Sequence, residues 1–331
     1  TFRPTYRRLG AIRATLIQHK PIGTKIAIAA FTATADPLSQ QTIKQVLQLD
    51  NPAKFILNPH RQNLRLAVKS IWTPRGRREQ LAKFIQQYPR QSGLVYVRTR
   101  QTSEELAARS IAQGDATAAY HAGLSPQSRR RIEQDWLDGK LQYVVCTCAF
   151  GMGINKADVR WIAHFQPPVL LAEYIQEIGR AGRDGKPAQA LLLTCEPTGW
   201  FYPEDRQRHK FFTQSIDRYY DLAGALVQRL PVSGNVNQIE RKFPQAEIAL
   251  SLLHSVGELV WETPFDYRRL VTGKVPNWKS LQAQQQSLYQ QVEKYVNDRG
   301  CRWKYLLTAF GCQPQSEGWR CGNCDRCRRD C

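Results

Sequence analysis

The sequence predicts an α/β protein in which a doubly wound parallel sheet is followed by a mainly helical region and a zinc-binding subdomain. Three observations lead to this fold class. Short apolar runs alternate with amphipathic segments as far as Pro197, and beyond that point the chain takes on a helical period with aromatic pairs. Its last part then gathers cysteines at close spacing.

Five apolar runs are expected to form strands, because near-continuous β-branched and aliphatic residues fit strands that are buried on both faces. They cover residues 25–35, 93–97, 142–147, 159–165 and 188–194. Residues 1–61 hold only the first of these strands between two expected helices. That is too little for a domain, so residues 1–61 are expected to be the C-terminal remnant of one.

Helices are expected between the strands. The stretch RREQLAKFIQQY, residues 77–88, places apolar residues at i, i+3 and i+4, which is one face of a helix. Ser103 is expected to cap the helix that begins SEELAARSIA. Ser125 is expected to cap the next helix, in which Pro126 takes the first position. This alternation places the doubly wound domain at residues 62–197.

Residues 198–287 are expected to be a mainly helical insertion. Within them AEIALSLLHSVGELVW, residues 246–261, is an apolar helix that passes into a strand, and the following ETPFDYRRLV can fold back as a second strand. Two helices and a hairpin are the outline of a winged helix, and a plain helical bundle is the alternative. Residues 288–331 are expected to form the zinc-binding subdomain.

The chain is strongly basic, with 47 Lys and Arg against 28 Asp and Glu and a formal net charge of +19. Such an excess suits a polyanionic partner, because phosphate contacts release condensed counterions; a basic surface that serves solubility alone is the alternative. The sequence has neither a signal segment nor an apolar run of the ~20 residues that span a bilayer. With nine cysteines, an odd number, these features predict a cytoplasmic protein without a membrane partner.

Four cysteines have the spacing of a structural zinc site: Cys301, Cys321, Cys324 and Cys327. The C-x2-C-x2-C spacing lets thiolates reach one tetrahedral ion, and the distant cysteine would clip a helix to that loop. Disulfides and free buried thiols are the alternatives. Cys312 and Cys331 are substitutes for one of the ligands. Four thiolates leave no open position, so the Zn²⁺ is expected to be structural.

The string QEIGRAGRDG, residues 176–185, sets Arg180 and Arg183 among three glycines. Planar, always-charged guanidinium groups in a glycine-rich turn indicate a phosphate ligand. The alternative is that both arginines cap a helix end and pair with Glu177 and Asp184. The local string leaves both hypotheses open.

Five features occur in a fixed order: AFTATAD (30–36), YHAGL (120–124), AFGMGINKADVR (149–160), YIQEIGRAGRDG (174–185) and the cysteine cluster. Together they resemble the RecQ family of superfamily-2 DNA helicases, and the likeness covers about residues 1–197 and 288–331. The resemblance implies two RecA-like lobes that clamp ATP between them, with single-stranded DNA across their top and 3′-to-5′ unwinding. It makes residues 1–61 a remnant of the first lobe and residues 62–197 the second lobe.

The resemblance also implies roles for residues that match the family's motifs. The motif that links the ATP cleft to the DNA face is matched by Thr32, Thr34 and Asp36. The motif that borders nucleotide and DNA backbone is matched by Gly151, Gly153, Asn155 and Asp158. The last motif is matched by Gln176, Arg180 and Arg183, with Arg183 expected first as the arginine that reaches the γ-phosphate. Such a guanidinium stabilises charge on the transferring phosphoryl group.

The sequence contains neither a GxxxxGKS/T loop, which would cradle phosphates, nor a DExH box, which would complete a Mg²⁺ site. In the family both lie upstream of text that resembles FRPTYRRLG. The expectation is therefore a helicase cut off within its first lobe, using ATP and Mg²⁺ but inactive alone. Its expected partner is DNA, both single-stranded and at duplex junctions.

One departure from the family's pattern and two alternative functions stay open. In many family members a winged helix follows the zinc region, whereas here the expected one precedes it, which puts its role in DNA binding in doubt. A non-enzymatic DNA-binding module is one alternative function. An RNA helicase of the same superfamily is another, although the cysteine cluster and GINKADVR favour the DNA branch.

Overall fold

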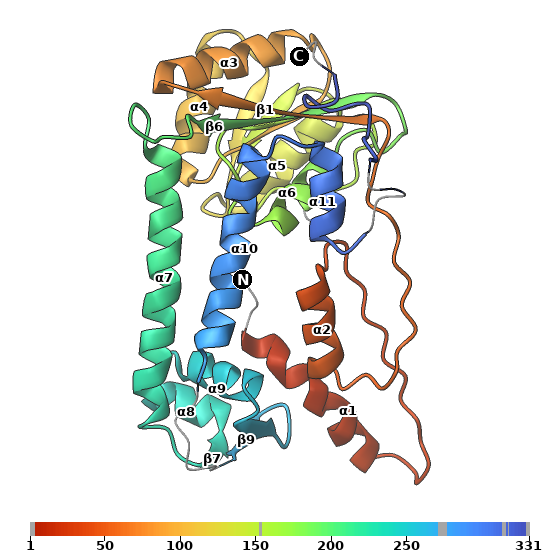
Figure 1. The fold of residues 1–331 in the computed structure, drawn as a ribbon, viewed down its shortest axis with the longest axis vertical. Coiled ribbons are helices and arrows are strands. Elements are labelled where there is room, and N and C mark those ends of the chain that lie inside the picture. Colours follow the sequence, from red (N-terminus) through yellow and green to blue (C-terminus); the bar gives the residue numbers. More distant parts are fainter. Residues whose placement is uncertain (1–3, 152–153, 271–276, 313–315, 317, 329–331) are drawn as a thin grey trace. The chain divides into compact units, whose positions relative to one another are not determined.

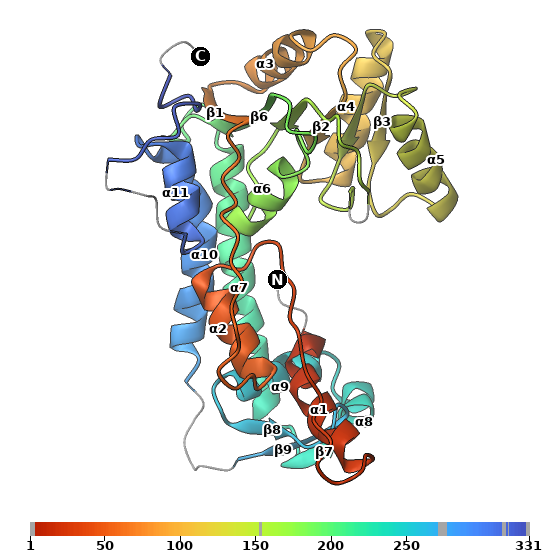
Figure 2. The ribbon, with the colours of Figure 1, turned by 90° about the vertical axis from the view of Figure 1, so that its right-hand side faces the viewer.

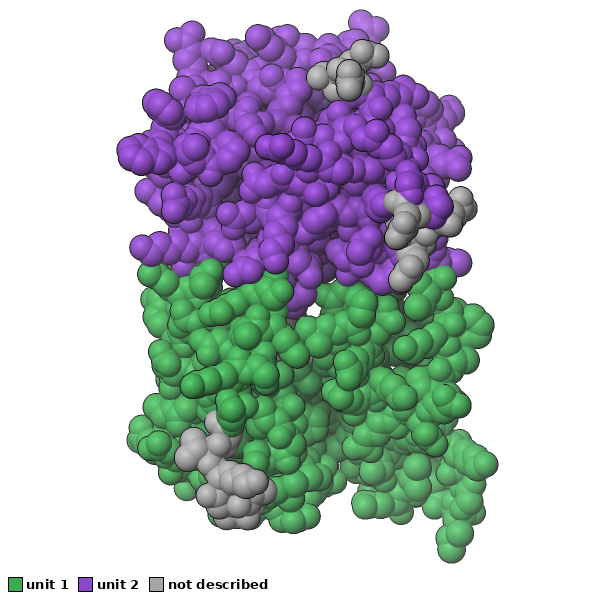
Figure 3. All heavy atoms as spheres, in the orientation of Figure 1, with its two compact units in different colours: residues 1–56, 211–287 green, residues 57–210, 288–331 purple. Residues whose placement is uncertain are grey.

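The computed structural model describes residues 4–151, 154–270, 277–312, 316 and 318–328. The chain forms two compact units, which Figure 3 colours separately. The first unit is residues 1–56 with 211–287, and the second is residues 57–210 with 288–331. The domain boundaries expected from the sequence stay a prediction. Within the described residues, no helix is both long and apolar enough to cross a membrane.

A six-stranded sheet organises the second unit (Figures 1 and 2). Its strands are β1 (Leu64–Ile71), β2 (Gly93–Tyr96), β3 (Thr117–Tyr120), β4 (Tyr143–Cys146), β5 (Trp161–His164) and β6 (Ala188–Cys195). The order is β1-β6-β5-β2-β4-β3, and every neighbouring pair is parallel. An all-parallel sheet of this kind is what a doubly wound α/β domain contains, so the expected fold class is confirmed.

Helices cover both faces of this sheet. On β2, Leu94 and Tyr96 belong to one apolar core, while Val95 and the next residue after the strand, Val97, belong to the other. The first core packs against α5 (Pro126–Leu137), α6 (Leu171–Ile178), α10 (Lys279–Asn297) and α11 (Arg302–Ala309). The second packs against α3 (Pro74–Gln86) and α4 (Arg100–Ala112). Burial on both faces explains why the central strands are continuous apolar runs.

Helix capping in this unit agrees with the sequence in one place and corrects it in another. Ser125 caps α5 by accepting a hydrogen bond from the Ser128 backbone N–H at 3.1 Å, as expected. Ser103 does not cap α4. The helix begins earlier, because the Thr99 hydroxyl accepts from the Thr102 N–H at 3.0 Å and leaves Ser103 buried inside the helix.

The strand expected at residues 25–35 is wrong. None of the described strands pairs with this segment, and Phe31 within it is 95% exposed. A strand exists through hydrogen bonds to a neighbouring strand, and apolar composition alone cannot supply them. The regular elements of this part of the chain are η1 (Pro4–Arg8), α1 (Leu9–Gln18) and α2 (Pro37–Val46).

The first unit also contains a small antiparallel sheet. Its chain runs through most of α7 (Glu204–Val227), then β7 (Ser233–Asn235), α8 (Val236–Lys242), α9 (Ala246–Ser255), β8 (Leu259–Trp261) and β9 (Asp266–Arg269). β9 lies between β7 and β8 and pairs with both. The two helices and the hairpin expected for a winged helix are present, so the region is not a plain helical bundle.

Candidate nucleotide-contact loop and metal centre

The residues that follow α6 form a tight turn, residues 179–186, which we call the arginine loop. Gly182 and Gly185 adopt φ values of +59° and +79°, a region that side chains rarely occupy. A Cβ added to Gly182 would also lie 2.6 Å from the Asn63 amide nitrogen. The turn therefore needs glycine at this position both for its backbone shape and for its close approach to a neighbour.

Arg180 joins the arginine loop to the string AFGMGI. Its Nη1 donates to the Gly151 carbonyl oxygen, and Gly151 has a φ of +96°. A Cβ at Gly151 would lie 2.5 Å from the Arg180 guanidinium carbon. The glycine thus makes room for the arginine, and two motifs that lie 29 residues apart meet backbone to side chain.

Arg183 makes a second link between the same motifs. Its Nη1 donates to Asn155 Oδ1 at 2.8 Å and its Nε to the Gly179 carbonyl at 3.4 Å, while the side chain stays exposed. Asp158 is not part of this link, because it pairs with Lys156 at 3.3 Å. Gln176 is exposed on α6, and Gly153 lies outside the described residues.

The alternative ion pairs for these arginines are wrong. Glu177 instead lies 3.1 Å from Arg98 and accepts a hydrogen bond from His164 Nε2 at 2.8 Å. Burial alone would raise the pKa of Glu177, but the charge of Arg98 and the bond from His164 lower it, so the carboxylate is charged. Asp184 pairs with Arg160 at 2.6 Å. Both carboxylates of the motif are thus satisfied by other groups.

Two side chains that the sequence analysis did not single out donate hydrogen bonds to backbone carbonyls of the arginine loop. Arg61 donates to the carbonyls of Gly179, at 3.1 Å, and Gly182. Asn63 Nδ2 donates to the carbonyls of Gly182 and Lys186, both at 2.8 Å. Because these donors occupy the loop's carbonyl oxygens, they fix its backbone without using the guanidinium groups of Arg180 and Arg183.

The residues of the AFTATAD string belong to the first unit. Asp36 caps α2, accepting from the Ser39 backbone N–H at 2.6 Å. Thr34 N donates to Thr32 Oγ1 at 3.4 Å. These contacts are local, and the roles expected for Thr32, Thr34 and Asp36 stay a prediction.

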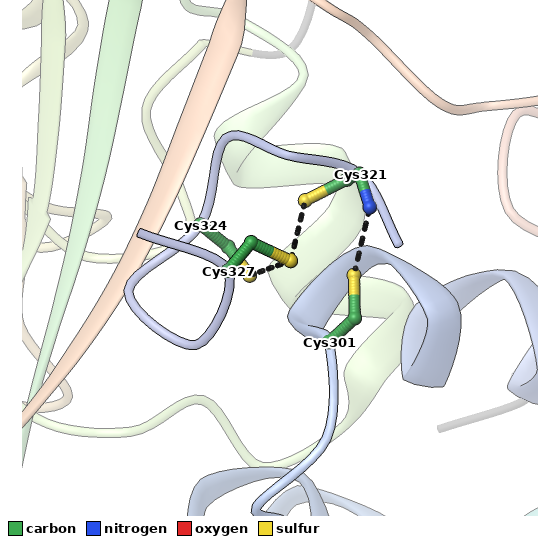
Figure 4. Close-up of side chains that lie close together, drawn as sticks. All are labelled: Cys301, Cys321, Cys324 and Cys327. Carbon is green, nitrogen blue, oxygen red and sulfur yellow. Dashed lines mark hydrogen bonds between the residues drawn. The ribbon is translucent and has the colours of Figure 1, made fainter. Parts of the chain in front are cut away.

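The four expected cysteines come together at the end of the chain (Figure 4). Cys301 precedes α11, and the other three lie in residues 321–328, which we call the cysteine knuckle. All four sulfurs lie within 4.8 Å of one another. Hydrogen bonds from the thiols of Cys301 and Cys321 lower the pKa of Cys324, which favours its thiolate.

The sulfur positions fit a tetrahedral ion. Four sulfurs that each lie about 2.3 Å from one Zn²⁺ are about 3.8 Å apart. The Cys321–Cys327 and Cys324–Cys327 sulfur separations are 3.8 Å and 3.5 Å. Cys312 is described by the structure and is not a member of this group. Cys331 lies outside the described residues. The closed set of four sulfurs suits a structural metal.

The cysteine knuckle covers one edge of the six-stranded sheet. Cys324 forms a parallel bridge with Leu66 of the edge strand β1, and the Asp325 N–H donates to the Leu66 carbonyl at 2.9 Å. The Val68 N–H donates to Asp325 Oδ2 at 3.2 Å. An unpaired strand edge invites pairing with other chains, and the knuckle occupies these edge groups instead.

Helix α11 is fixed to the same edge. Its first residue, Arg302, is almost fully buried and pairs with Asp325 at 3.0 Å. Arg302 Nη1 also donates to the Tyr295 carbonyl at 2.6 Å, and Trp303 Nε1 donates to the Leu64 carbonyl at 3.1 Å. The cysteine cluster, the buried ion pair and the sheet edge therefore form one continuous structure.

Comparison with known proteins places these features in a family. Residues 76–185 match the family described as Helicase conserved C-terminal domain, and residues 266–328 match RecQ zinc-binding. An ATP-dependent DNA helicase RecQ from Synechocystis is 43% identical over 328 residues, which cover 99% of this chain and 67% of the relative. The chain belongs to the RecQ helicase family.

Other RecQ relatives match a shorter part. The RecQ helicase of Haemophilus influenzae is 41% identical over 58% of this chain and 29% of its own length. The RecQ-like DNA helicase blm-1 of Caenorhabditis elegans is 35% identical over 58% of the chain and 19% of its own length. The chain thus spans less than a third of these two relatives, while the Synechocystis RecQ matches it almost from end to end.

Proposed function

We propose that the chain is the second-lobe and zinc-binding part of an ATP-dependent helicase that unwinds DNA from 3′ to 5′ in recombination and repair. Membership of the RecQ family supports this reaction, since the relatives' names describe ATP-dependent DNA helicases. The observation that carries the proposal is that Arg180 contacts Gly151 and Arg183 contacts Asn155. Two guanidinium groups on one glycine-rich turn suit the phosphates of ATP.

Arg183 is the arginine that contacts the γ-phosphate in this proposal. It is exposed and bonded to a neutral amide, whereas Arg180 is half-buried and bonded to a backbone carbonyl. Arg180 therefore shapes the turn, and Arg183 supplies the charge. Gln176 lies in the last turn of α6, shortly before the loop. Removing an arginine finger costs about 10³–10⁵ in turnover.

The other residues of the site follow the motifs. Gly151, Gly153, Asn155 and Asp158 border the nucleotide and the DNA backbone, while Thr32, Thr34 and Asp36 couple the ATP cleft to the DNA. ATP and Mg²⁺ are the cofactors, but the sequence has no GxxxxGKS/T loop to cradle the phosphates of ATP. Hydrolysis then requires a first lobe that carries this loop, and the 331 residues alone are inactive.

Zinc has a structural part in this proposal. Cys301, Cys321, Cys324 and Cys327 hold Zn²⁺, which fastens the cysteine knuckle and α11 to the edge of the sheet. The partner is DNA, as single strands and at duplex junctions. The net charge of +19 supports a polyanionic partner.

The test uses the complete helicase, with a P-loop-bearing first lobe joined to this chain. Arg183→Ala should lower DNA-stimulated ATP turnover by about 10³-fold or more while single-strand binding persists. Lys186→Ala, an exposed cation of the same loop, is the matched control and should change turnover little. Unchanged turnover in Arg183→Ala would refute the assignment, and DNA-stimulated ATPase by the 331 residues alone would refute their inactivity.

A second candidate is a DNA-binding module without ATP chemistry, which is favoured by the absence of a P-loop sequence from these residues. The complete assembly distinguishes the two. If it binds DNA but neither hydrolyses ATP nor displaces strands, the module is the correct function. Strand displacement of matched RNA duplexes, with none of DNA, would instead identify an RNA helicase.

A further inference from the structure

Three exposed aromatic residues follow the ends of β1 and β6 in the chain. Trp72 follows β1 directly, and Trp200 and Phe201 lie in the loop between β6 and α7; we call these three residues the aromatic patch. Their exposed fractions are 57%, 85% and 74%. The ring centroids of Trp72 and Phe201 lie 5.7 Å apart, with the rings tilted at 59°. Side chains of this kind usually bury 150–250 Å², so a cluster of them in solvent marks a binding surface.

The loop that carries Trp200 and Phe201 has a fixed shape. The buried carboxylate of Glu196 accepts hydrogen bonds from the N–H groups of Gly199, at 2.9 Å, and Phe201, at 3.0 Å, and from the Thr198 hydroxyl. Burial would raise the pKa of Glu196, but these bonds lower it to about 2. The exposure of the two aromatic rings is therefore built into the loop.

The position of the patch fits a nucleic acid strand. Parallel sheets bind ligands outside the carboxyl ends of their strands, and both the aromatic patch and the turn at Gly151 lie at this edge. The strand order β1-β6-β5-β2-β4 puts four inter-strand steps, about 19 Å, between β1 and β4. About six stacked nucleotides, at roughly 3.4 Å each, cover this distance.

Cations flank the aromatic patch. Arg206 is exposed, and its Nη1 donates to the Thr198 carbonyl at 3.2 Å, which holds it on the aromatic loop. Arg75, three residues after Trp72, pairs with Glu79 at 2.7 Å, and its side chain stays 85% exposed. Guanidinium groups beside aromatic rings match a polyanion whose bases can stack. An apolar protein surface would gain nothing from these charges.

We propose that the aromatic patch is a base-stacking site for single-stranded DNA. The inference rests on the proposed helicase function and extends the strand path beyond the turn at Gly151. Every base has a π-face, so stacking on Trp72, Trp200 and Phe201 tolerates any sequence, as an unwinding enzyme requires. Arg206 contacts the backbone phosphate between stacked bases.

The experiment titrates the 331-residue chain with a fluorescently labelled oligothymidylate and follows anisotropy at several salt concentrations. Trp200→Ala and Trp72→Ala should each weaken binding by roughly fivefold to a hundredfold, with the salt dependence unchanged. Trp200→Phe should retain most of the affinity. Arg206→Gln should weaken binding and lower the slope of log K against log salt by about 0.7.

Ile111→Ala is the matched control, because Ile111 is 54% exposed on α4 and belongs to no proposed site. It should bind like the parent chain, and all variants should keep the parent's melting temperature. Aromatic variants that bind the oligonucleotide as tightly as the parent would overturn the inference. The same holds if these variants differ from the parent only in oligomeric state. A parent chain that fails to bind the oligonucleotide would refute the proposed function as well.

Discussion

The arginine loop and the cysteine knuckle are two tight turns that are fastened to one short segment, residues 61–66. Arg61 and Asn63 direct their side chains to carbonyls of the arginine loop. The backbone carbonyls of Gln62, Leu64 and Leu66 accept instead from Asn323, Trp303 and Asp325, on the side of the knuckle. One segment thus supports the candidate catalytic loop with side chains and the candidate metal centre with its backbone.

The difference lies in what each attachment leaves free. Within the described residues, neither Arg180 nor Arg183 pairs with a carboxylate, since the loop is held through its carbonyl oxygens. The knuckle is closed, with its four sulfurs turned toward one another and Asp325 locked by Arg302. Among the described residues, Arg180 and Arg183 donate only to neutral acceptors, the carbonyls of Gly151 and Gly179 and the amide of Asn155, and keep their positive charge uncompensated. The knuckle, by contrast, has its sulfurs and its Asp325 carboxylate engaged in contacts that hold the fold together.

Loss of the metal should have the largest effect. A structural Zn²⁺ contributes its binding free energy directly to folding. Cys324→Ser or chelation should therefore lower the free energy of unfolding by several kcal/mol and the melting temperature by about 10 °C or more. Elemental analysis should find about one Zn²⁺ per parent chain. Cys312→Ser lies outside the cluster and should keep both the metal and the melting temperature. A metal-free parent with an unchanged melt after chelation would contradict the structural role.

Breaking the buried ion pair of the knuckle should come next. Arg302→Met leaves Asp325 charged and without its partner, which costs about 3–5 kcal/mol for buried pairs. A urea midpoint shift with an unchanged slope measures this loss. The control, Arg299→Met, changes an exposed arginine shortly before α11 and should stay within about 0.5 kcal/mol. Equal midpoints for the two variants would show that the ion pair does not fasten α11.

The arginine loop should respond more locally. Arg61→Ala removes donors from the carbonyls of Gly179 and Gly182, and such bonds are worth about 1–2 kcal/mol when half-buried. Hydrogen exchange should speed up in residues 179–186 and stay unchanged in the cysteine knuckle. Gln62→Ala keeps its backbone carbonyl and is the control. Faster exchange in both loops would mean that the segment moves as one piece, which would break the contrast between them.

Much of this architecture could be predicted from local patterns. The apolar runs gave four of the parallel strands, and the cysteine spacing gave all four members of the cluster. β1 escaped notice because Arg65 and Lys69 interrupt its apolar run, as an edge strand allows. The prediction for residues 25–35 was wrong for the opposite reason. The segment is apolar, but no described strand lies beside it to complete the hydrogen bonds of a strand.

The contacts between distant residues could not be predicted. Arg61 lies 118 residues from Gly179, and Asp325 lies 257 residues from Val68. No local periodicity encodes such a pair. The alternative in which Glu177 pairs with an arginine of its own motif fails for the same reason, because the fold brings Arg98 to it from the end of β2.

The smallest effect should come from the aromatic loop, which is also held by hydrogen bonds to one charged group. The pKa of Glu196 is lowered from 4.5 to about 2, so its stabilising effect is complete above pH 4.5 and is lost as the pH falls toward 2. Glu196→Gln should therefore melt a few degrees below the parent at pH 7. The two melting temperatures should converge as the pH falls from about 4.5 to about 2. The exposed Glu105→Gln on α4 should show no such convergence, and a difference for Glu196→Gln that stays constant with pH would mean that the shape of the side chain, not its charge, holds the loop.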